Sequence, residues 1–150
     1  MSDIRVRSAN DRRRDMRLAA GRLGVDEAYI STLVETFYDR VRSDPELGPI
    51  FARAIPGDWG PHLAKMKDFW ASVALGDTRY DGRPVPAHQK LSDLKPPHFA
   101  IWLALFHHTL RDTAPSLEAV DFFMEKARRI AQSLEFAISG VPPILKERRT

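Results

Sequence analysis

The chain has 150 residues, of which 43% are hydrophobic and 29% are charged, and its formal net charge at pH 7 is +3. This composition fits one globular domain with a single core, and it argues against a disordered chain or a strong polyanion binder. Because cysteine is absent, disulfides, thiolate metal sites and cysteine nucleophiles are excluded. We expect a cytoplasmic protein, since no apolar run approaches the about 20 residues of a membrane-spanning helix and no signal peptide is recognisable.

The first 25 residues are polar and rich in arginine, and the chain ends in the basic letters KERRT. A short helix is predicted through the letters MRLAAGRL. Basic clusters such as Arg12, Arg13 and Arg14 are typical of solvated or disordered segments, so we expect no binding of nucleic acid.

A first long helix is predicted after Asp26, which is a suitable N-cap. Its end is expected before Asp44, because a residue that precedes a proline disfavours the helical conformation. The segment ELGPIFARAI that follows is predicted to be a short turn. The apolar residues of the helix recur at helical spacing and comprise Ile30, Leu33, Val34, Phe37, Tyr38 and Val41.

Three more long helices are predicted further along the chain. Asp58 can cap the second, the prolines at 96 and 97 open the third, and the fourth runs from near Ser116 to about Ile138. Glycines and prolines break up residues 76–97, so that no helix longer than about two turns fits there. With four substantial helices and no convincing strand, the predicted fold class is all-α.

Three hydrogen-bonding side chains lie on apolar helix faces: Tyr38 on the first helix, His62 on the second and Trp102 on the third. Burying one such donor unpaired costs roughly 1–3 kcal/mol. Taken singly, each is explained by a core side chain that bonds the backbone. Together with His88 in the broken segment RPVPAHQKL, they suggest a haem site, with one histidine on the iron and donors that face a bound diatomic ligand. A zinc site fits less well, because no paired spacing such as HExxH is present.

The remaining polar residues offer little chemistry. Glu35 and Asp39 fall on the polar side of their helix, and His98 is expected to be exposed in a first helical turn. His107 and His108 are adjacent, so they point about 100° apart and cannot hold one metal together. Motifs for phosphate binding, dinucleotide binding and serine hydrolysis are missing.

Several sequence fragments resemble the group III truncated haemoglobins and occur in the order expected for them. These fragments include FYDRV, DPELGPIF, PHL, DFW, GRPVPAHQKL and HFAIWLALF. The resemblance implies a shortened globin fold, a two-over-two helical sandwich that holds haem b. It also implies a globin domain at 26–138, flanked by the Arg-rich extension at 1–25 and a tail at 139–150.

The same resemblance implies roles for individual residues. His88 matches the proximal histidine that bonds the haem iron. Tyr38, His62 and Trp102 match the distal positions that face the ligand. Side chains implied to contact the haem are Phe51, Met66, Trp70 and Phe99, and candidates for the haem propionates are Lys65, Arg79, Arg83 and Lys90.

The function implied by the resemblance is reversible binding of O2 and other small ligands, such as NO and CO, by a monomeric haem protein. A redox enzyme is the alternative use of the same pocket, either an NO dioxygenase or a peroxidase-like enzyme served by an external reductase. A different class also stays open from the residues alone. In that alternative, a haem-free helical module binds an acidic partner through the Arg-rich N-terminus.

Overall fold

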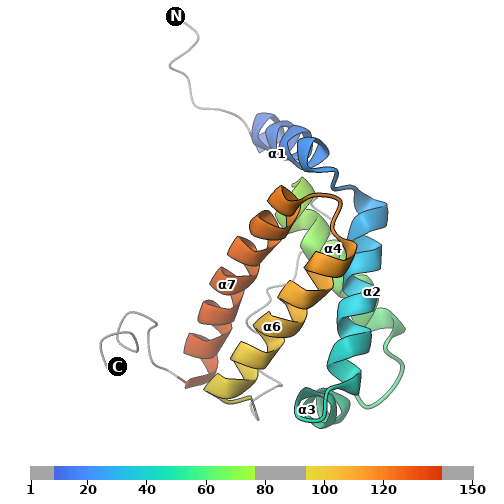
Figure 1. The fold of residues 1–150 in the computed structure, drawn as a ribbon, viewed down its shortest axis with the longest axis vertical. Coiled ribbons are helices and arrows are strands. Elements are labelled where there is room, and N and C mark those ends of the chain that lie inside the picture. The colour runs from blue at the N-terminus through green and yellow to red at the C-terminus, as the bar shows by residue number, and fades with distance from the viewer. Residues whose placement is uncertain (1–8, 77–93, 140–150) are drawn as a thin grey trace, which may run out of the picture.

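The structure, a computed structural model, describes residues 9–76 and 94–139, and these residues form helices joined by turns, without a strand (Figure 1). The all-α prediction is therefore confirmed. No helix in these two ranges is long and apolar enough to span a membrane. The helices are α1 (Ala9–Leu23), α2 (Glu27–Ser43), α3 (Leu47–Ala54), α4 (Gly60–Leu75), α6 (Pro96–Thr113) and α7 (Leu117–Ser139).

The predicted helix ends agree with the capping contacts. The Asp26 carboxylate accepts a hydrogen bond from the Tyr29 backbone N–H at 2.8 Å and so caps α2. Asp58 lies one residue further out than expected, and its carboxylate accepts from the Gly60 N–H at 3.0 Å where α4 begins. The Ser116 hydroxyl accepts from the backbone N–H of the third residue of α7, at 3.1 Å.

Two predictions for the N-terminal half are wrong, because more residues are helical than was expected. The segment ELGPIFARAI forms the helix α3 rather than a short turn. Asp44 explains the difference, because its carboxylate accepts from the Leu47 N–H at 2.8 Å and satisfies the first turn. The helix expected at MRLAAGRL begins earlier, at Ala9, and α1 packs on α4 and α7 through the fully buried Ala20.

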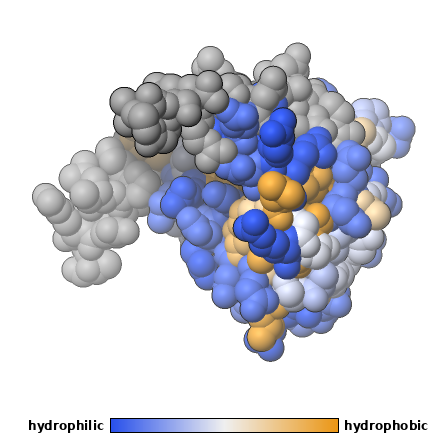
Figure 2. Space-filling view, turned by 90° about the horizontal axis from the view of Figure 1, so that it is seen from above, coloured by the Kyte–Doolittle hydropathy of each residue, from blue (hydrophilic) through white to orange (hydrophobic). Residues whose placement is uncertain are grey.

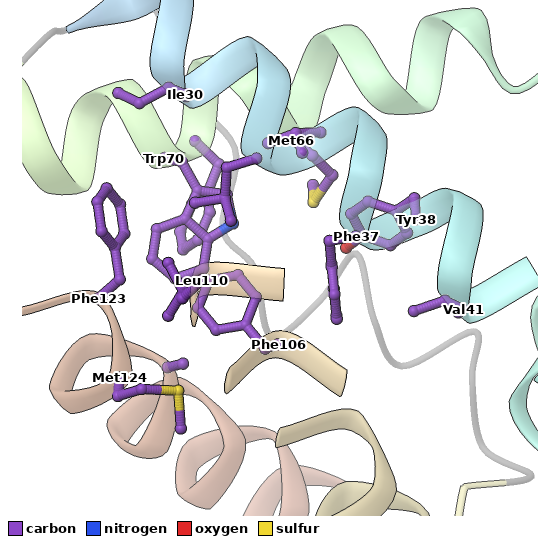
Figure 3. Close-up of a cluster of buried hydrophobic side chains, with 14 of the residues drawn as sticks. Ile30, Phe37, Tyr38, Val41, Met66, Trp70, Phe106, Leu110, Phe123 and Met124 are labelled. Carbon is purple, nitrogen blue, oxygen red and sulfur yellow. The ribbon is translucent and has the colours of Figure 1, made fainter. Parts of the chain in front are cut away.

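The helices form two layers around one core, as expected for the two-over-two sandwich. Figure 3 shows α2 and α4 on one side of the core and α6 and α7 on the other. Large rings fill the space between the layers. Trp70 of α4 stacks on Phe106 of α6 with ring centroids 5.1 Å apart, and Phe37 of α2 meets Phe106 edge to face at 5.0 Å. The layers are thus held by aromatic contacts that run directly from α2 and α4 to α6.

A polar contact also joins α2 to α6. The Arg40 guanidinium donates to the Asp112 carboxylate at 2.7 Å and to the Thr109 hydroxyl at 3.3 Å. Thr109 is fully buried, and its hydroxyl in turn donates to the carbonyl of Leu105 at 2.8 Å. This contact holds the C-terminal half of α2, which carries Tyr38, against α6.

The outer surface of the described residues is mostly hydrophilic. Figure 2 looks onto the end of the molecule where α1 lies and shows apolar residues grouped among hydrophilic ones. Large hydrophobic side chains that are exposed in the described part of the chain are Leu18, Leu117 and Phe136. Scattered residues of this kind are ordinary on a globular surface.

Candidate functional site

Tyr38 lies at the centre of a group of aromatic rings contributed by three helices. Its ring centroid is 5.2 Å from that of His62, 6.0 Å from that of Trp59 and 6.3 Å from that of Phe51. We call these four residues the Tyr38 cluster. The helices that supply them are α2, α3 and the start of α4, so the cluster forms where the C-terminal half of α2 meets the other two.

The hydroxyl of Tyr38 is the polar feature of this cluster. The residue is 2% exposed, and burial raises the pKa of its hydroxyl well above 10.0, with no side-chain hydrogen bond to lower it. Tyr29 on the same helix differs, because its hydroxyl is hydrogen-bonded to that of Thr113 at 3.0 Å. Tyr38 therefore keeps its proton at neutral pH and holds a buried O–H that can donate to a ligand.

The direction of the Tyr38 hydroxyl supports its use as a hydrogen-bond donor to a ligand. Figure 3 shows its hydroxyl pointing toward Phe37 and Met66, into the interior between the layers. Met66 is 4% exposed and lies on α4, one turn after His62. The hydroxyl thus faces the side of the pocket that the resemblance assigns to the ligand.

His62 lies in the first turn of α4, perpendicular to Tyr38 with an interplanar angle of 86°. Its Nε2 atom is shielded from solvent although the residue as a whole is half-buried. The imidazole also meets the Trp59 indole edge to face, at 5.3 Å and 88°. The structure therefore brings His62 beside Tyr38, as the sequence-based assignment requires.

Trp102 reaches the site from the opposite layer. Its ring contacts Phe37 edge to face at 5.5 Å, and Phe37 in turn contacts the Tyr38 ring at 4.9 Å. Trp102 also stacks on Phe106 at 5.8 Å, with the two planes only 6° apart. Phe37 thus lies against both distal residues and links the two layers at the site.

The residues predicted to contact a haem are all buried. Phe51 is in the Tyr38 cluster and is 1% exposed. Trp70 contacts Phe106 and Phe123 in the core. Phe99 is buried in the first turn of α6. The contacts of Phe51, Met66, Trp70 and Phe99 with a cofactor stay predictions.

Several assigned residues lie outside the described residues. They are His88, Arg79, Arg83 and Lys90, so their roles stay predictions. Lys65 is exposed on α4.

The other histidines and the acidic residues agree with the sequence analysis except at one position. His98, expected to be exposed, has a side chain that is only 19% exposed. Its Nδ1 accepts from the Lys95 backbone N–H at 2.9 Å, because the imidazole folds back over the start of α6. His107 and His108 are exposed, and Glu35 is on the surface, where it pairs with a lysine of α4 at 2.7 Å.

Trp59 was not among the site residues predicted from the sequence. It belongs to the apolar stripe of the second helix, where it reads as a core side chain. Its spacing of three residues from His62, which makes the two neighbours on a helix surface, is the signal that could have found it. The Arg42 guanidinium carbon lies over its ring, 4.8 Å from the centroid.

The family described as bacterial-like globins matches residues 21–136. The group 3 truncated hemoglobin of Campylobacter jejuni is 35% identical over 114 residues, which cover 74% of this chain and 89% of the relative. The chain belongs to this family, as a group III truncated haemoglobin.

The fold of this globin leads to the same family. A crystal structure of the group III truncated hemoglobin from Campylobacter jejuni matches it with a TM-score of 0.67 at 35% identity. The match covers 76% of this chain and 91% of the other. The protein is therefore a haem-binding globin, and this decides against the haem-free helical module.

The described residues fit a haem. The buried Tyr38 hydroxyl is a donor that suits a polar ligand beside an otherwise apolar wall. Phe51 and Phe37 both pack edge to face against the Tyr38 ring, so the donor lies among apolar aromatic side chains of the kind that line cofactor sites. A structural metal site is not an alternative in this part of the chain, since residues 9–76 and 94–139 hold no group of three or more histidine, aspartate or glutamate side chains suited to a metal.

Proposed function

We propose that this globin holds haem b through His88 and reversibly binds O2, with NO and CO as further ligands, beside Tyr38, His62 and Trp102. The observation that carries the proposal is the hydroxyl of the buried Tyr38, which keeps its proton at neutral pH and points toward Phe37 and Met66. A buried hydroxyl costs roughly 1–3 kcal/mol when it has no partner. A polar ligand in the pocket would remove that cost.

The side chains divide the work in this proposal. The haem iron supplies the coordination site for the small ligand when the group is bound. Tyr38 donates a hydrogen bond to the ligand, and Phe37 fixes the position of its ring. His62 and Trp102 supply further N–H groups on the same side. Each such bond is worth about 1 kcal/mol net, so two of them slow ligand release by roughly tenfold or more.

The proposal also includes the oligomeric state of the protein and its location in the cell. We propose that the globin works as a monomer in the cytoplasm, where a reducing environment suits a chain without cysteine.

Redox use of the same pocket is the second candidate, either as an NO dioxygenase or as a peroxidase-like enzyme with an external reductase. The observation in its favour is that Tyr38 and His62, two side chains with polar groups, pack directly against each other. Polar groups fixed in advance stabilise charge that develops during a reaction. Sustained NO consumption that depends on an added reductase would select this use, whereas binding alone would select the first.

The test of the proposal is spectroscopic. Absorption spectra of the purified protein should show a Soret band in the ferric, ferrous and CO forms. The ferrous form should take up O2 reversibly and release it slowly. If haem reconstitution produced no Soret band, or if the ferrous form took up neither O2 nor CO, the proposal would be wrong.

A further inference from the structure

Trp59 is a buried aromatic residue at the start of a helix, a position where a small polar residue is usual. The residue is the N-cap of α4, and it makes no side-chain capping hydrogen bond. Serine, threonine, aspartate and asparagine are preferred at this position because their oxygens bond the first N–H groups. Asp58, one residue earlier, bonds the Gly60 N–H instead. The indole must therefore be explained by its tertiary contacts.

The indole makes ring contacts with the other three residues of the Tyr38 cluster, and one cation lies over it. The indole centroid is 5.3 Å from that of His62, 6.0 Å from Tyr38 and 6.4 Å from Phe51. Trp59 is 7% exposed although it begins a helix at the surface. One side chain thus contacts both the hydrogen-bonding residues and the phenylalanine of the site.

Arg42 explains how the indole is held. It lies in the last turn of α2, where a positive charge is favourable at the negative end of the helix dipole. Its guanidinium lies over the Trp59 ring, and the residue is exposed on its outer side. The backbone of Arg42 is fixed in turn by α3, because Gly48 approaches its carbonyl oxygen so closely that a Cβ would stand 2.6 Å away.

We propose that Trp59, held by Arg42, is a positioning residue that keeps the His62 imidazole against Tyr38 and controls exchange of the ligand. The inference rests on the proposed ligand pocket. Trp59 contacts both His62 and Tyr38, so its removal takes away a ring that holds the His62 imidazole and opens space beside Tyr38. A positioning residue of this kind differs from a donor. Loss of a donor raises only the dissociation rate of the ligand, whereas loss of a covering ring raises both the association and dissociation rates.

The experiment compares two properties among variants: the rates of ligand binding and release, and the reactivity of His62. Trp59→Leu should raise both the CO association rate after flash photolysis and the O2 dissociation rate. Trp59→Phe, which keeps an aromatic ring, should restore most of the wild-type behaviour. Arg42→Met should raise both rates by about two- to fivefold, the factor that corresponds to one exposed cation–π contact. Lys126→Met is the matched control, because Lys126 lies over Phe122, at 5.5 Å, on α7.

Chemical modification of histidine by diethyl pyrocarbonate gives a readout that does not depend on ligand binding. His62 should react faster in Trp59→Leu and Arg42→Met than in the wild type, as measured by mass spectrometry of its peptide. The exposed His107 and His108 should react equally in all variants and serve as internal references. Helical circular dichroism shows which variants are folded, and Arg42→Met and Trp59→Phe cover the case in which Trp59→Leu is not.

The outcomes separate this inference from the proposed function. If the wild type binds neither O2 nor CO, the proposed function fails, while faster modification of His62 in the variants would still support its positioning by Trp59. If the wild type binds both ligands but folded Trp59→Leu and Arg42→Met leave the rates unchanged, the inference is overturned. A rise in the O2 dissociation rate alone, without faster modification of His62, would also overturn it, because Trp59 would then neither hold the imidazole nor control entry of the ligand.

Discussion

Tyr38 and His62 meet edge to face between α2 and α4, with ring centroids 5.2 Å apart and planes at 86°. The Tyr38 side chain is buried, and the Nε2 atom of His62 is shielded from solvent. The contact therefore joins α2 to α4 through two side chains that each carry a polar group.

Alkaline pH should destabilise the fold through Tyr38. Burial raises the folded-state pKa of this hydroxyl above the 10.0 of an exposed tyrosine, so its contribution to stability is complete below pH 10 and is lost as the pH rises further. The free energy of unfolding should fall by about 1.4 kcal/mol for each pH unit above about 10 from this one proton. Urea titrations between about pH 9 and pH 11 should show a shallower fall in Tyr38→Phe than in the wild type. Equal falls in the two proteins would show that Tyr38 ionises freely in the folded state.

The position of α3 should depend on Gly48. A Cβ at this residue would lie 2.6 Å from the backbone oxygen of Arg42, a contact that only a shift of the backbone can relieve. Gly48→Ala should therefore destabilise the fold by about 1–3 kcal/mol, measured by urea unfolding at neutral pH. The shift also displaces Phe51 from the Tyr38 ring.

Gly21→Ala is the control for this prediction. Gly21 lies within α1, and a Cβ there would meet nothing within 4 Å. Alanine in a helix is more favourable than glycine by about 0.5–1 kcal/mol, so this variant should be slightly more stable than the wild type. Equal behaviour of the two variants would contradict the close packing of α3 on α2.

Much of this arrangement follows from the sequence, because apolar residues at helical spacing and prolines mark the long helices. The limits of α2 and α7 and the start of α6 agree with the predicted ones to within one or two residues. The helix α3 was not predicted, since its eight residues include Pro49 and its stability comes from the Asp44 cap and from burial of Leu47, Ile50 and Phe51. Short helices of this kind depend on tertiary packing more than on local preference.

Part of the site was also predictable from the apolar residues at helical spacing. The residues assigned to the distal side, Tyr38, His62 and Trp102, stand out because each is a polar group on an apolar stripe. Trp59 does not stand out, since an aromatic ring on such a stripe is explained by the core, and its contact with Arg42 joins two helices that a pattern within one helix does not relate. The partial burial of His98 was also missed, because it depends on a capping hydrogen bond to the Lys95 N–H that a residue pattern does not reveal.

Replacement of His88 tests the assignment of the iron ligand. His88→Ala removes the imidazole, so the Soret band of the ferric and ferrous forms should be lost or strongly shifted. His107→Ala is the matched control, because His107 is exposed on α6 and should leave the spectra unchanged. Haem spectra that are the same in both variants would show that another base, such as His62, bonds the iron.

The O2 dissociation rate of Tyr38→Phe, compared with that of Tyr29→Phe, is the most direct measurement of the central claim. Both tyrosines lie on α2, but the Tyr29 hydroxyl is hydrogen-bonded to Thr113, whereas Tyr38 is buried and its hydroxyl points toward Phe37 and Met66. Tyr38→Phe removes one hydrogen bond to the ligand and should raise the rate by about fivefold to tenfold, while Tyr29→Phe should leave it within about twofold of the wild type. An unchanged rate in folded, haem-loaded Tyr38→Phe would contradict the claim that the Tyr38 hydroxyl holds the ligand.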